Sequence, residues 1–239
     1  MFSAVVAGIF GLIIGIPALR LRGDYLAIIT LGFGEIIRVI LTNIDSVLGF
    51  KFTYGASGLK RIPKFSGFHL VFICVVLSCV LIHMIMKSRH GRAILSIREN
   101  EIAAESVGIN TTYYKTMAFV VSAMLAGVAG CLYAGYLGSL YPATFRFMKS
   151  IEILVMVVLG GIGSMLGSIF SAAVLTVLPE LLRSVADYRM VAYSLALVLM
   201  MIFRPKGLMG SYDFSMSRTL ENVLNKLLHR EAQKGDGVQ

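Results

Sequence analysis

The chain has 239 residues, of which 57% are hydrophobic and 15% are charged, and its formal net charge is +9. Soluble domains usually hold roughly 45–50% apolar and about 25% charged residues, so this chain has too few polar side chains to cover a soluble core. Its basic residues lie in short links between apolar blocks and form neither a face nor a stripe, so no nucleic-acid partner is expected. The composition therefore predicts an all-α integral membrane protein.

The apolar blocks predict a polytopic transmembrane helical bundle of about seven spans. A hydrocarbon core about 30 Å thick is crossed by about 20 helical residues. Blocks of about this length lie at Phe2–Leu19, Asp24–Thr42, Gly67–Met86, Thr116–Leu137, Phe147–Gly163, Ser164–Leu182 and Arg189–Phe203. The second, fifth and seventh blocks are short or interrupted, which suggests broken or tilted helices. Met1 leads into an apolar run without a basic segment, so no cleaved signal peptide is expected.

The distribution of Lys and Arg between the links predicts the orientation. The loop Lys87–Lys115, the Arg20/Arg22 turn and the tail from Arg204 would together hold thirteen basic residues on one side, against eight on the other. Cytoplasmic links are usually the more basic ones, so we expect the C-terminal tail to be cytoplasmic. Residues 1–210 are expected to form the transmembrane domain. Residues 211–239 are expected to form a tail with an amphipathic helix, because apolar residues recur there at helical spacing.

An acid and a base lie three residues apart inside the second span. Each charge at a helix centre costs about 2.5–3.5 kcal/mol on insertion scales, so Glu35 and Arg38 are expected to face protein or water. Their spacing permits mutual pairing. Gly32 and Gly34 precede them and are expected to loosen the helix. The four residues are candidates for a substrate pathway; the alternative is a charge pair near the outer end of the helix.

A glycine cluster follows the fifth span, at Gly160, Gly161 and Gly163, before Ser164. Irregular backbone at membrane depth is tolerated only where it faces protein or a water-filled cavity, so these glycines are also pathway candidates. The alternative is a tight turn between two helices. Small residues spaced by four positions, such as Gly11 and Gly15, predict close helix packing.

The loop Lys87–Lys115 contains a short polar segment that predicts a helix from Arg98 to Gly108. Ile97, Ala104 and Gly108 would lie on roughly one side of it, and Gly108 would end it because glycine accepts the left-handed conformation. We interpret this segment as a cytoplasmic docking helix; the alternative is a solvated connector.

No catalytic centre or metal site is expected. The four histidines are scattered, and the three cysteines lie inside apolar spans without metal-ligand spacing. A secondary transporter is an alternative, since it also places charges beside broken helices, but it would show inverted repeats. A non-transporting membrane assembly factor is a second alternative.

Four ordered segments resemble the LivM-type permease subunits of branched-chain amino-acid ABC importers. They are Ala18–Arg38, Arg98–Asn110, Gly160–Ser164 and Phe203–Leu208. The resemblance covers the chain to about Gly210. Such permeases usually have further N-terminal spans, so we expect a truncated product or a start placed too late. The EAA–Gly pattern of ABC permeases fits loosely, because Ile102 stands where its first Glu would be.

The resemblance implies one half of a heterodimeric pore in the bacterial inner membrane. A second permease subunit would complete the pore, a periplasmic substrate-binding protein would deliver the amino acid, and two ATPase subunits would bind ATP, with no cofactor on this chain. The implied substrates are branched-chain or other hydrophobic amino acids, with urea and short amides as alternatives. The ATPase subunits would dock on a coupling helix comprising Arg98, Glu99, Asn100, Glu101, Ala104 and Gly108.

Overall fold

The computed structural model describes residues 2–19, 21, 24–48, 54–181, 194 and 198. Two compact units divide the chain after Ser150. The first unit contains α1 (Phe2–Ala18), α2 (Asp24–Leu48), η1 (Gly55–Ser57), β1 (Leu59–Lys60), α3 (Phe68–Lys87), α4 (Arg89–Glu99), α5 (Glu101–Ser106), α6 (Thr111–Leu137), β2 (Ser139–Leu140) and η2 (Pro142–Phe145). The helix α7 (Phe147–Gly160) begins in the last residues of the first unit, and α8 (Met165–Leu181) lies in the second unit.

The first six predicted spans coincide with helices of the described chain. Within it, α3 and α6 are long and apolar enough to cross a membrane, and α1 and residues Met165–Glu180 are shorter apolar helices. The seventh predicted span lies almost entirely outside the described residues, as does the predicted tail. The second span is unbroken: α2 runs for 25 residues without interruption.

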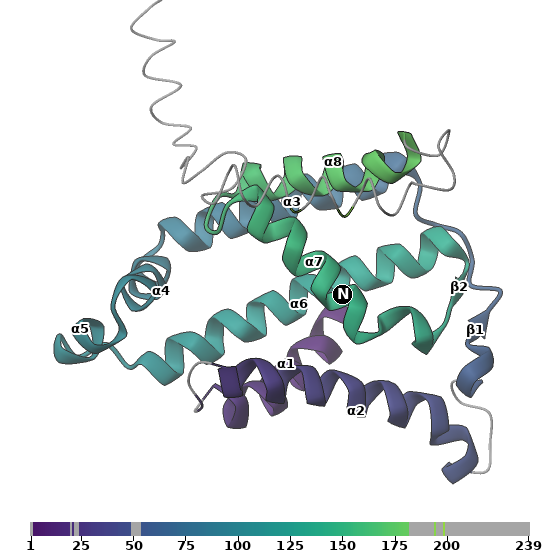
Figure 1. Cartoon of the computed structure of the whole chain (residues 1–239), viewed down its shortest axis with the longest axis horizontal. Helices are drawn as coiled ribbons and strands as arrows, with labels where there is room; N and C mark the ends of the chain where they lie inside the picture. The colour runs from purple at the N-terminus through teal and green to yellow at the C-terminus, as the bar shows by residue number, and fades with distance from the viewer. Residues whose placement is uncertain are drawn as a thin grey trace, which may run out of the picture. The chain divides into compact units, whose positions relative to one another are not determined.

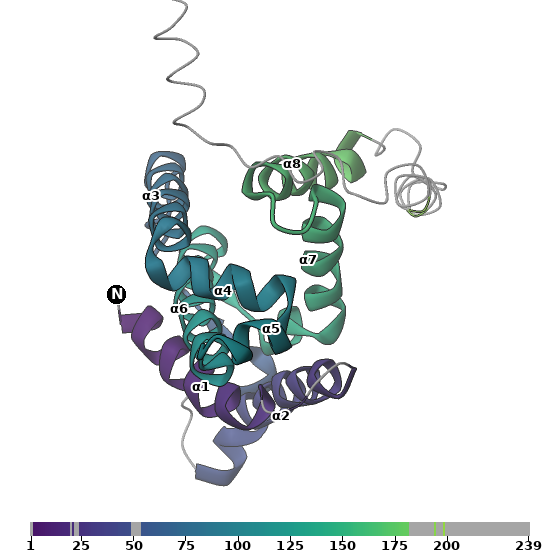
Figure 2. The same ribbon diagram turned by 90° about the vertical axis from the view of Figure 1, so that its left-hand side faces the viewer.

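The closest helix packing in the first unit joins α1 to α6 through glycines (Figures 1 and 2). A Cβ atom added to Gly11 would lie 2.6 Å from the Cβ of Ala123, and one added to Gly127 would lie 2.6 Å from the Cβ of Ala7. Glycine at these positions lets the two backbones approach closely, which is how helices associate when lipid supplies no hydrophobic drive. The small-residue spacing in the sequence therefore correctly indicated tight packing.

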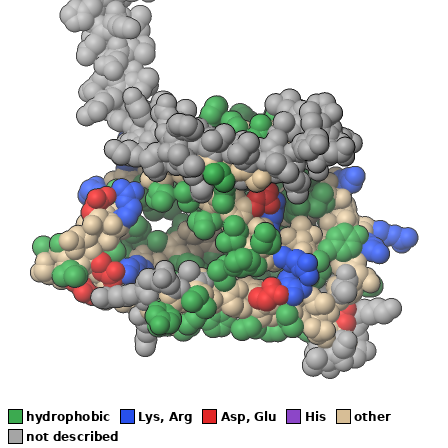
Figure 3. All heavy atoms as spheres, viewed as in Figure 1, with side chains coloured by type: hydrophobic (Ala, Val, Ile, Leu, Met, Phe, Trp, Pro, Cys, Tyr) green, Lys and Arg blue, Asp and Glu red, His purple; other side chains and the backbone are tan. Residues whose placement is uncertain are grey.

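Opposite ends of α6 carry different structures (Figure 1). At its C-terminal end, β2 pairs antiparallel with β1, with Leu59 opposite Leu140. At its N-terminal end lie α4 and α5. Charged side chains lie at both ends of the visible face and also in two groups between them, among hydrophobic ones (Figure 3).

A sharp corner joins α3 to α4 at Ser88. Its Oγ accepts a hydrogen bond from the backbone N of Gly91 at 3.2 Å and so caps α4. A Cβ on Gly91 would collide with the carbonyl oxygens of Ile85 and Met86. Only glycine lets the first turn of α4 lie this close to the last turn of α3.

In the second unit, α7 and α8 are joined by a tight turn. Gly161 and Gly163 have φ values of 109° and 93°, which side chains with a Cβ rarely adopt. Ser164 caps α8 by accepting a hydrogen bond from Gly167 N at 3.1 Å. A Cβ on Gly160 would meet the Gly167 backbone, so the two helices touch at the turn.

Candidate functional site

Glu35 and Arg38 form an ion pair on α2. Arg38 donates a hydrogen bond from Nε to Glu35 Oε1 at 2.9 Å, and its Nη2 contacts the same oxygen. The Arg38 side chain is 19% exposed and that of Glu35 48%. The pairing that the spacing permitted is therefore present. It leaves the second carboxylate oxygen of Glu35 open to further donors in the part of the chain that the structure describes.

A second basic residue lies near this pair. The 3₁₀-helix η2 packs against α2, and Arg146 follows it directly. The positive charge of Arg146 is felt at the Glu35 carboxylate, but less than that of Arg38, and among the described residues no hydrogen bond or ion pair joins Arg146 to Glu35. One acidic side chain therefore has two basic ones in its surroundings, from segments more than 100 positions apart in the sequence. Such an arrangement suits a ligand that carries both a carboxylate and an ammonium group.

The expectation that Gly32 and Gly34 loosen α2 is wrong for the backbone, because the helix continues through them. Neither glycine is required by packing, since a Cβ at either position would meet nothing within 4 Å among the described residues. Both are exposed. Gly32 and Gly34 are two residues apart and therefore lie on nearly opposite sides of α2.

The polar side chains around the ion pair are satisfied within the helix. Thr42 Oγ1 donates to the carbonyl oxygen of Arg38 at 2.8 Å, and Asn43 Nδ2 donates to that of Val39 at 2.9 Å. Such bonds to the preceding turn satisfy polar groups without a partner helix.

The glycine cluster forms the α7–α8 turn described above, with Gly160 in contact with α8. Gly160 and Gly161 are buried, and Gly163 is exposed. The tight turn between α7 and α8 is by itself a structural reason for glycine at these positions.

The segment after α3 is two helices, which corrects the prediction of one helix from Arg98 to Gly108. The break falls at Asn100, whose φ and ψ of −156° and 109° are those of extended backbone. Its Oδ1 accepts a hydrogen bond from Ala103 N at 3.0 Å and caps α5. Asn side chains bond readily to nearby backbone N–H groups, and this bond ends α4 and begins α5 at the same residue.

Gly108 ends α5 as predicted. Its φ is 84°, and Ile109 N donates to the carbonyl oxygen of Ala104 at 3.1 Å while Gly108 N donates to that of Glu105 at 3.0 Å. These two bonds make a Schellman motif, which closes the last turn of a helix. The prediction that Ile97, Ala104 and Gly108 lie on one side of the segment is wrong in part. Ile97 and Ala104 are buried, whereas Gly108 is exposed.

Two polar contacts hold α5 against the start of α6. Lys115 Nζ lies 2.7 Å from Glu101 Oε1, with side chains 27% and 29% exposed. Thr111, which is 5% exposed, donates from Oγ1 to Glu105 Oε1 at 3.1 Å. The Arg98–Glu99 pair, by contrast, is exposed to solvent. A displacement of α5 is thus passed directly to the first turn of α6.

The exposed side of α5 carries two apolar side chains that the sequence prediction left out. Ile102 is 74% exposed and Val107 75%. A helix of six residues that ends in a polar link has no need of such side chains for its own folding. The signal for them was present in the sequence, since both are large apolar residues inside an otherwise polar loop. The side of α5 on which Ile102 and Val107 lie could not be predicted, because it depends on the break at Asn100.

Over the described ranges, no group of three or more His, Cys, Asp or Glu is placed to hold a metal ion. Arg98, Glu99 and Asn100 lie at the exposed junction of α4 and α5. The predicted site residues therefore fall into three separate places: the α2 ion pair, the α7–α8 turn and the α4–α5 segment.

A family model and several relatives point to the same family. Residues 1–204 match the family described as Branched-chain amino acid transport system / permease component. The high-affinity branched-chain amino acid transport system permease protein LivM of Salmonella typhimurium is 38% identical over 241 residues, covering 87% of this chain and 56% of LivM. LivM of Escherichia coli strain K12 is 37% identical, and the match covers the same shares of this chain and of LivM. The corresponding protein LivH of Salmonella typhimurium is 33% identical over 125 residues, covering 52% of this chain and 40% of LivH.

The chain thus spans about half the length of the LivM proteins that it matches. No solved structure gives a significant match. The family model nevertheless covers most of the chain, and the resemblance found in the sequence is confirmed. This chain belongs to the family of permease components of branched-chain amino acid transport systems, which are polytopic helical membrane proteins and not enzymes.

Proposed function

We propose that this chain is a membrane-spanning permease subunit of an ATP-driven ABC importer for branched-chain or other hydrophobic amino acids. Residues 1–210 form its membrane domain and residues 211–239 a cytoplasmic tail. The protein lies in the bacterial inner membrane, with the α4–α5 segment on the cytoplasmic side. ATP is bound by two separate ATPase subunits, and this chain holds no cofactor.

The observation that carries the proposal is the attachment of α5 to α6. An ATPase subunit that moves α5 moves the first turn of a spanning helix with it, because Glu101 and Glu105 bond to Lys115 and Thr111. Rigid-body displacement of this kind is a common way to couple two states of a protein. The apolar side chains of Ile102 and Val107 supply the surface that a partner would bury.

The proposed substrate path passes the ion pair of α2. An amino acid carries one positive and one negative group, and Glu35, Arg38 and Arg146 offer a complementary charge for each. Gly32 and Gly34 are proposed to leave room for the solute along α2, because neither carries a side chain and a Cβ at either position would meet none of the described residues within 4 Å. Gly160, Gly161 and Gly163, where α7 turns into α8, are also proposed as residues of a substrate path.

The proposed partners follow from the family. Salmonella typhimurium has two permease proteins, LivM and LivH, named for high-affinity branched-chain amino acid transport, and this chain is similar to both. A heterodimer of two such permeases is therefore proposed, with a periplasmic substrate-binding protein on the side of β1 and β2.

Co-purification from native membranes tests the assembly. In a gentle detergent, the wild-type chain is expected to retain ATPase subunits and a second permease, identified by mass spectrometry. The double variant Ile102→Ser, Val107→Ser should lose the ATPase subunits and keep the second permease. The matched variant Ile102→Leu, Val107→Leu keeps both side chains apolar and should behave like wild type. Recovery of the wild-type chain alone, intact and monodisperse, would rule out the proposed assembly.

Uptake of labelled leucine tests the path. Replacing both charges by Glu35→Gln and Arg38→Gln should abolish uptake while leaving the amount of protein in the membrane unchanged. Each single variant should also lower the amount of protein, since removing one partner of an ion pair at low dielectric leaves an uncompensated charge. Uptake at the wild-type rate by the double variant would exclude this path.

A further inference from the structure

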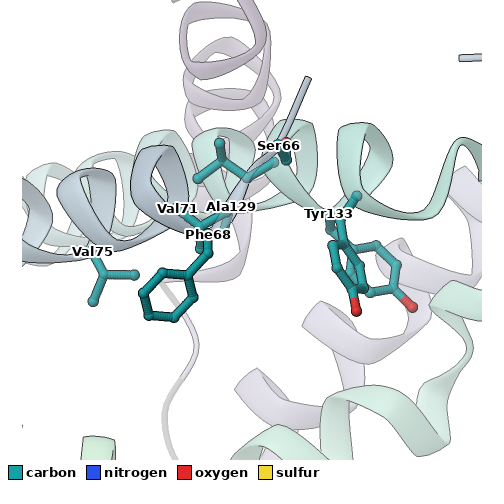
Figure 4. Close-up of a pocket in the computed structure, with 8 residues that line it drawn as sticks. Ser66, Phe68, Val71, Val75, Ala129 and Tyr133 are labelled. Atoms are coloured by element: carbon teal, nitrogen blue, oxygen red, sulfur yellow. The ribbon is translucent and has the colours of Figure 1, made fainter. Parts of the chain in front are cut away.

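An apolar pocket lies between α3 and α6 in the first unit (Figure 4). Its volume is about 470 Å³, and it is lined by Ser66, Phe68, Val71, Val75, Ala129, Leu132, Tyr133 and Tyr136. Roughly 300–1,000 Å³ is typical of sites for small molecules. No residue of α3 is buried, because α3 packs mainly against α4 and makes few contacts with α6. The two helices thus enclose a space that neither fills.

The pocket is confined to one leaflet of the membrane. On α3 it extends from the first residue, Phe68, to Val75, and on α6 from Tyr136, next to the last residue, back to Ala129. At a rise of 1.5 Å per residue, each stretch is about 10 Å long. This depth lies within the roughly 15 Å that one leaflet contributes to the hydrocarbon core. The pocket therefore runs from the interface next to β1 towards the middle of the bilayer.

Basic side chains stand at the interfacial end of the pocket. Lys60, Arg61 and Lys64 are exposed, and they lie on or just after β1, in the segment that leads to Ser66. The Lys64 side chain passes over Gly138 at the end of α6, since a Cβ added there would lie 3.2 Å from Lys64 Cε. Two residues of extended chain span at most about 7 Å, so the ammonium group is close to the mouth of the pocket. Among the described residues, these three cations form no ion pair.

The polar atoms of the pocket also lie at this end. Ser66 Oγ is buried and has no hydrogen-bond partner in the part of the chain that the structure describes. Tyr133 and Tyr136 come from the last turns of α6, where tyrosines commonly mark the membrane interface. The deep end is apolar, with Val75, Ala129 and Leu132. An occupant must therefore be apolar at one end and able to accept a hydrogen bond at the other.

We infer that this pocket binds one acyl chain of an anionic phospholipid, whose phosphate lies at Lys64 and Arg61. The exposed tyrosines at this end of the pocket, Tyr133 and Tyr136, supply the hydroxyl groups that donate a hydrogen bond to an ester carbonyl at the level of the interface. A free amino acid does not fit, since the lining holds no charged side chain for its ammonium or carboxylate group. The site is independent of the transport function and requires only that α3 and α6 span the membrane.

Photolabelling of the full chain, purified with its co-purifying subunits and reconstituted in vesicles, tests the site. The probes are phosphatidylglycerol and phosphatidylcholine, each with a diazirine in the acyl chain. Phosphatidylglycerol is expected to label peptides that contain Val71, Val75 and Ala129 more strongly than phosphatidylcholine does. Lys64→Gln should lower labelling by phosphatidylglycerol about fivefold, because a basic residue near the surface favours anionic lipid by about that factor. Lys87→Gln, at the other end of α3, serves as the matched control.

A second pair of variants tests the acyl groove. Ala129→Phe fills the pocket and should abolish labelling, whereas Ala126→Phe places the same side chain one turn deeper, at an exposed position outside the lining, and should not. Circular dichroism and recovery of the subunits show whether each variant is folded. Equal labelling by both lipids, labelling unchanged by Ala129→Phe, or protection of the pocket by a co-purifying subunit would each overturn the inference.

Discussion

Substituting Glu101→Gln tests whether α5 transmits force to α6. The Lys115–Glu101 distance is 2.7 Å and both side chains are more than two-thirds buried, so this pair lies between an exposed and a fully buried one. Exposed pairs contribute about 0.2–1 kcal/mol, and breaking a buried pair costs about 3–5 kcal/mol. We expect Glu101→Gln to weaken the contact between α5 and α6 by on the order of 1 kcal/mol. This change lowers the population of molecules in which α5 is attached to α6 about fivefold.

The assay compares solute uptake with ATP hydrolysis in proteoliposomes that contain the assembled complex. Uptake should fall about fivefold relative to hydrolysis, because the ATPase subunits still turn over but move α6 less often. Glu99→Gln removes a charge from the same proposed docking segment but lies outside the two bonds that join α5 to α6, so it should leave the ratio of uptake to hydrolysis unchanged. An unchanged ratio of uptake to hydrolysis in the Glu101→Gln complex would refute the coupling role of this contact.

Three further substitutions test the packing. Gly91→Ala should lower the thermal midpoint in detergent sharply, because its Cβ would collide with the last turn of α3, whereas Gly67→Ala meets nothing and should not. Gly11→Val should cost about 1–3 kcal/mol through overpacking against α6, measured by unfolding in mixed micelles, and Gly130→Val should be nearly neutral. Ser164→Ala should cost about 0.5–2 kcal/mol through loss of the α8 cap.

Each of these results has an outcome that would contradict it. A midpoint for Gly91→Ala equal to that of Gly67→Ala would show that the corner between α3 and α4 can open without loss of stability. Equal stabilities of Gly11→Val and Gly130→Val would mean that α1 and α6 are not packed tightly enough at Gly11 to exclude a larger side chain. A Ser164→Ala protein as stable as wild type would mean that another group satisfies the start of α8.

The spanning helices were predictable because the bilayer imposes a length and a polarity on them. The ends of the helices differ from the predicted ends where local hydrogen bonding extends a helix beyond its apolar block. α2 runs on to Leu48 rather than ending at Thr42, and Asn43 bonds to the preceding turn there. α6 begins at Thr111 rather than Thr116, because Asn110 caps it by accepting a hydrogen bond from the backbone of its first turn.

The candidate site was predictable only where its residues are close in the sequence. Glu35 and Arg38 are three residues apart, and their pairing follows from helix geometry. Arg146 reaches this pair through tertiary packing, which no local pattern encodes. The break at Asn100 was missed because the apolar and polar residues on both sides fit a continuous helix. What ends α4 is a single side-chain hydrogen bond that competes with the next helical turn.

The contact between α1 and α6 has a consequence for how the protein is made. Gly11 and Ala123 are separated by more than 100 residues, and ribosomes add roughly 5–20 residues per second, so α1 waits for its partner about 5–20 s. During that time the glycine face of α1 is exposed to lipid or to another small-residue helix. Early in biogenesis, α1 is therefore the part of this chain most open to pairing with the wrong helix.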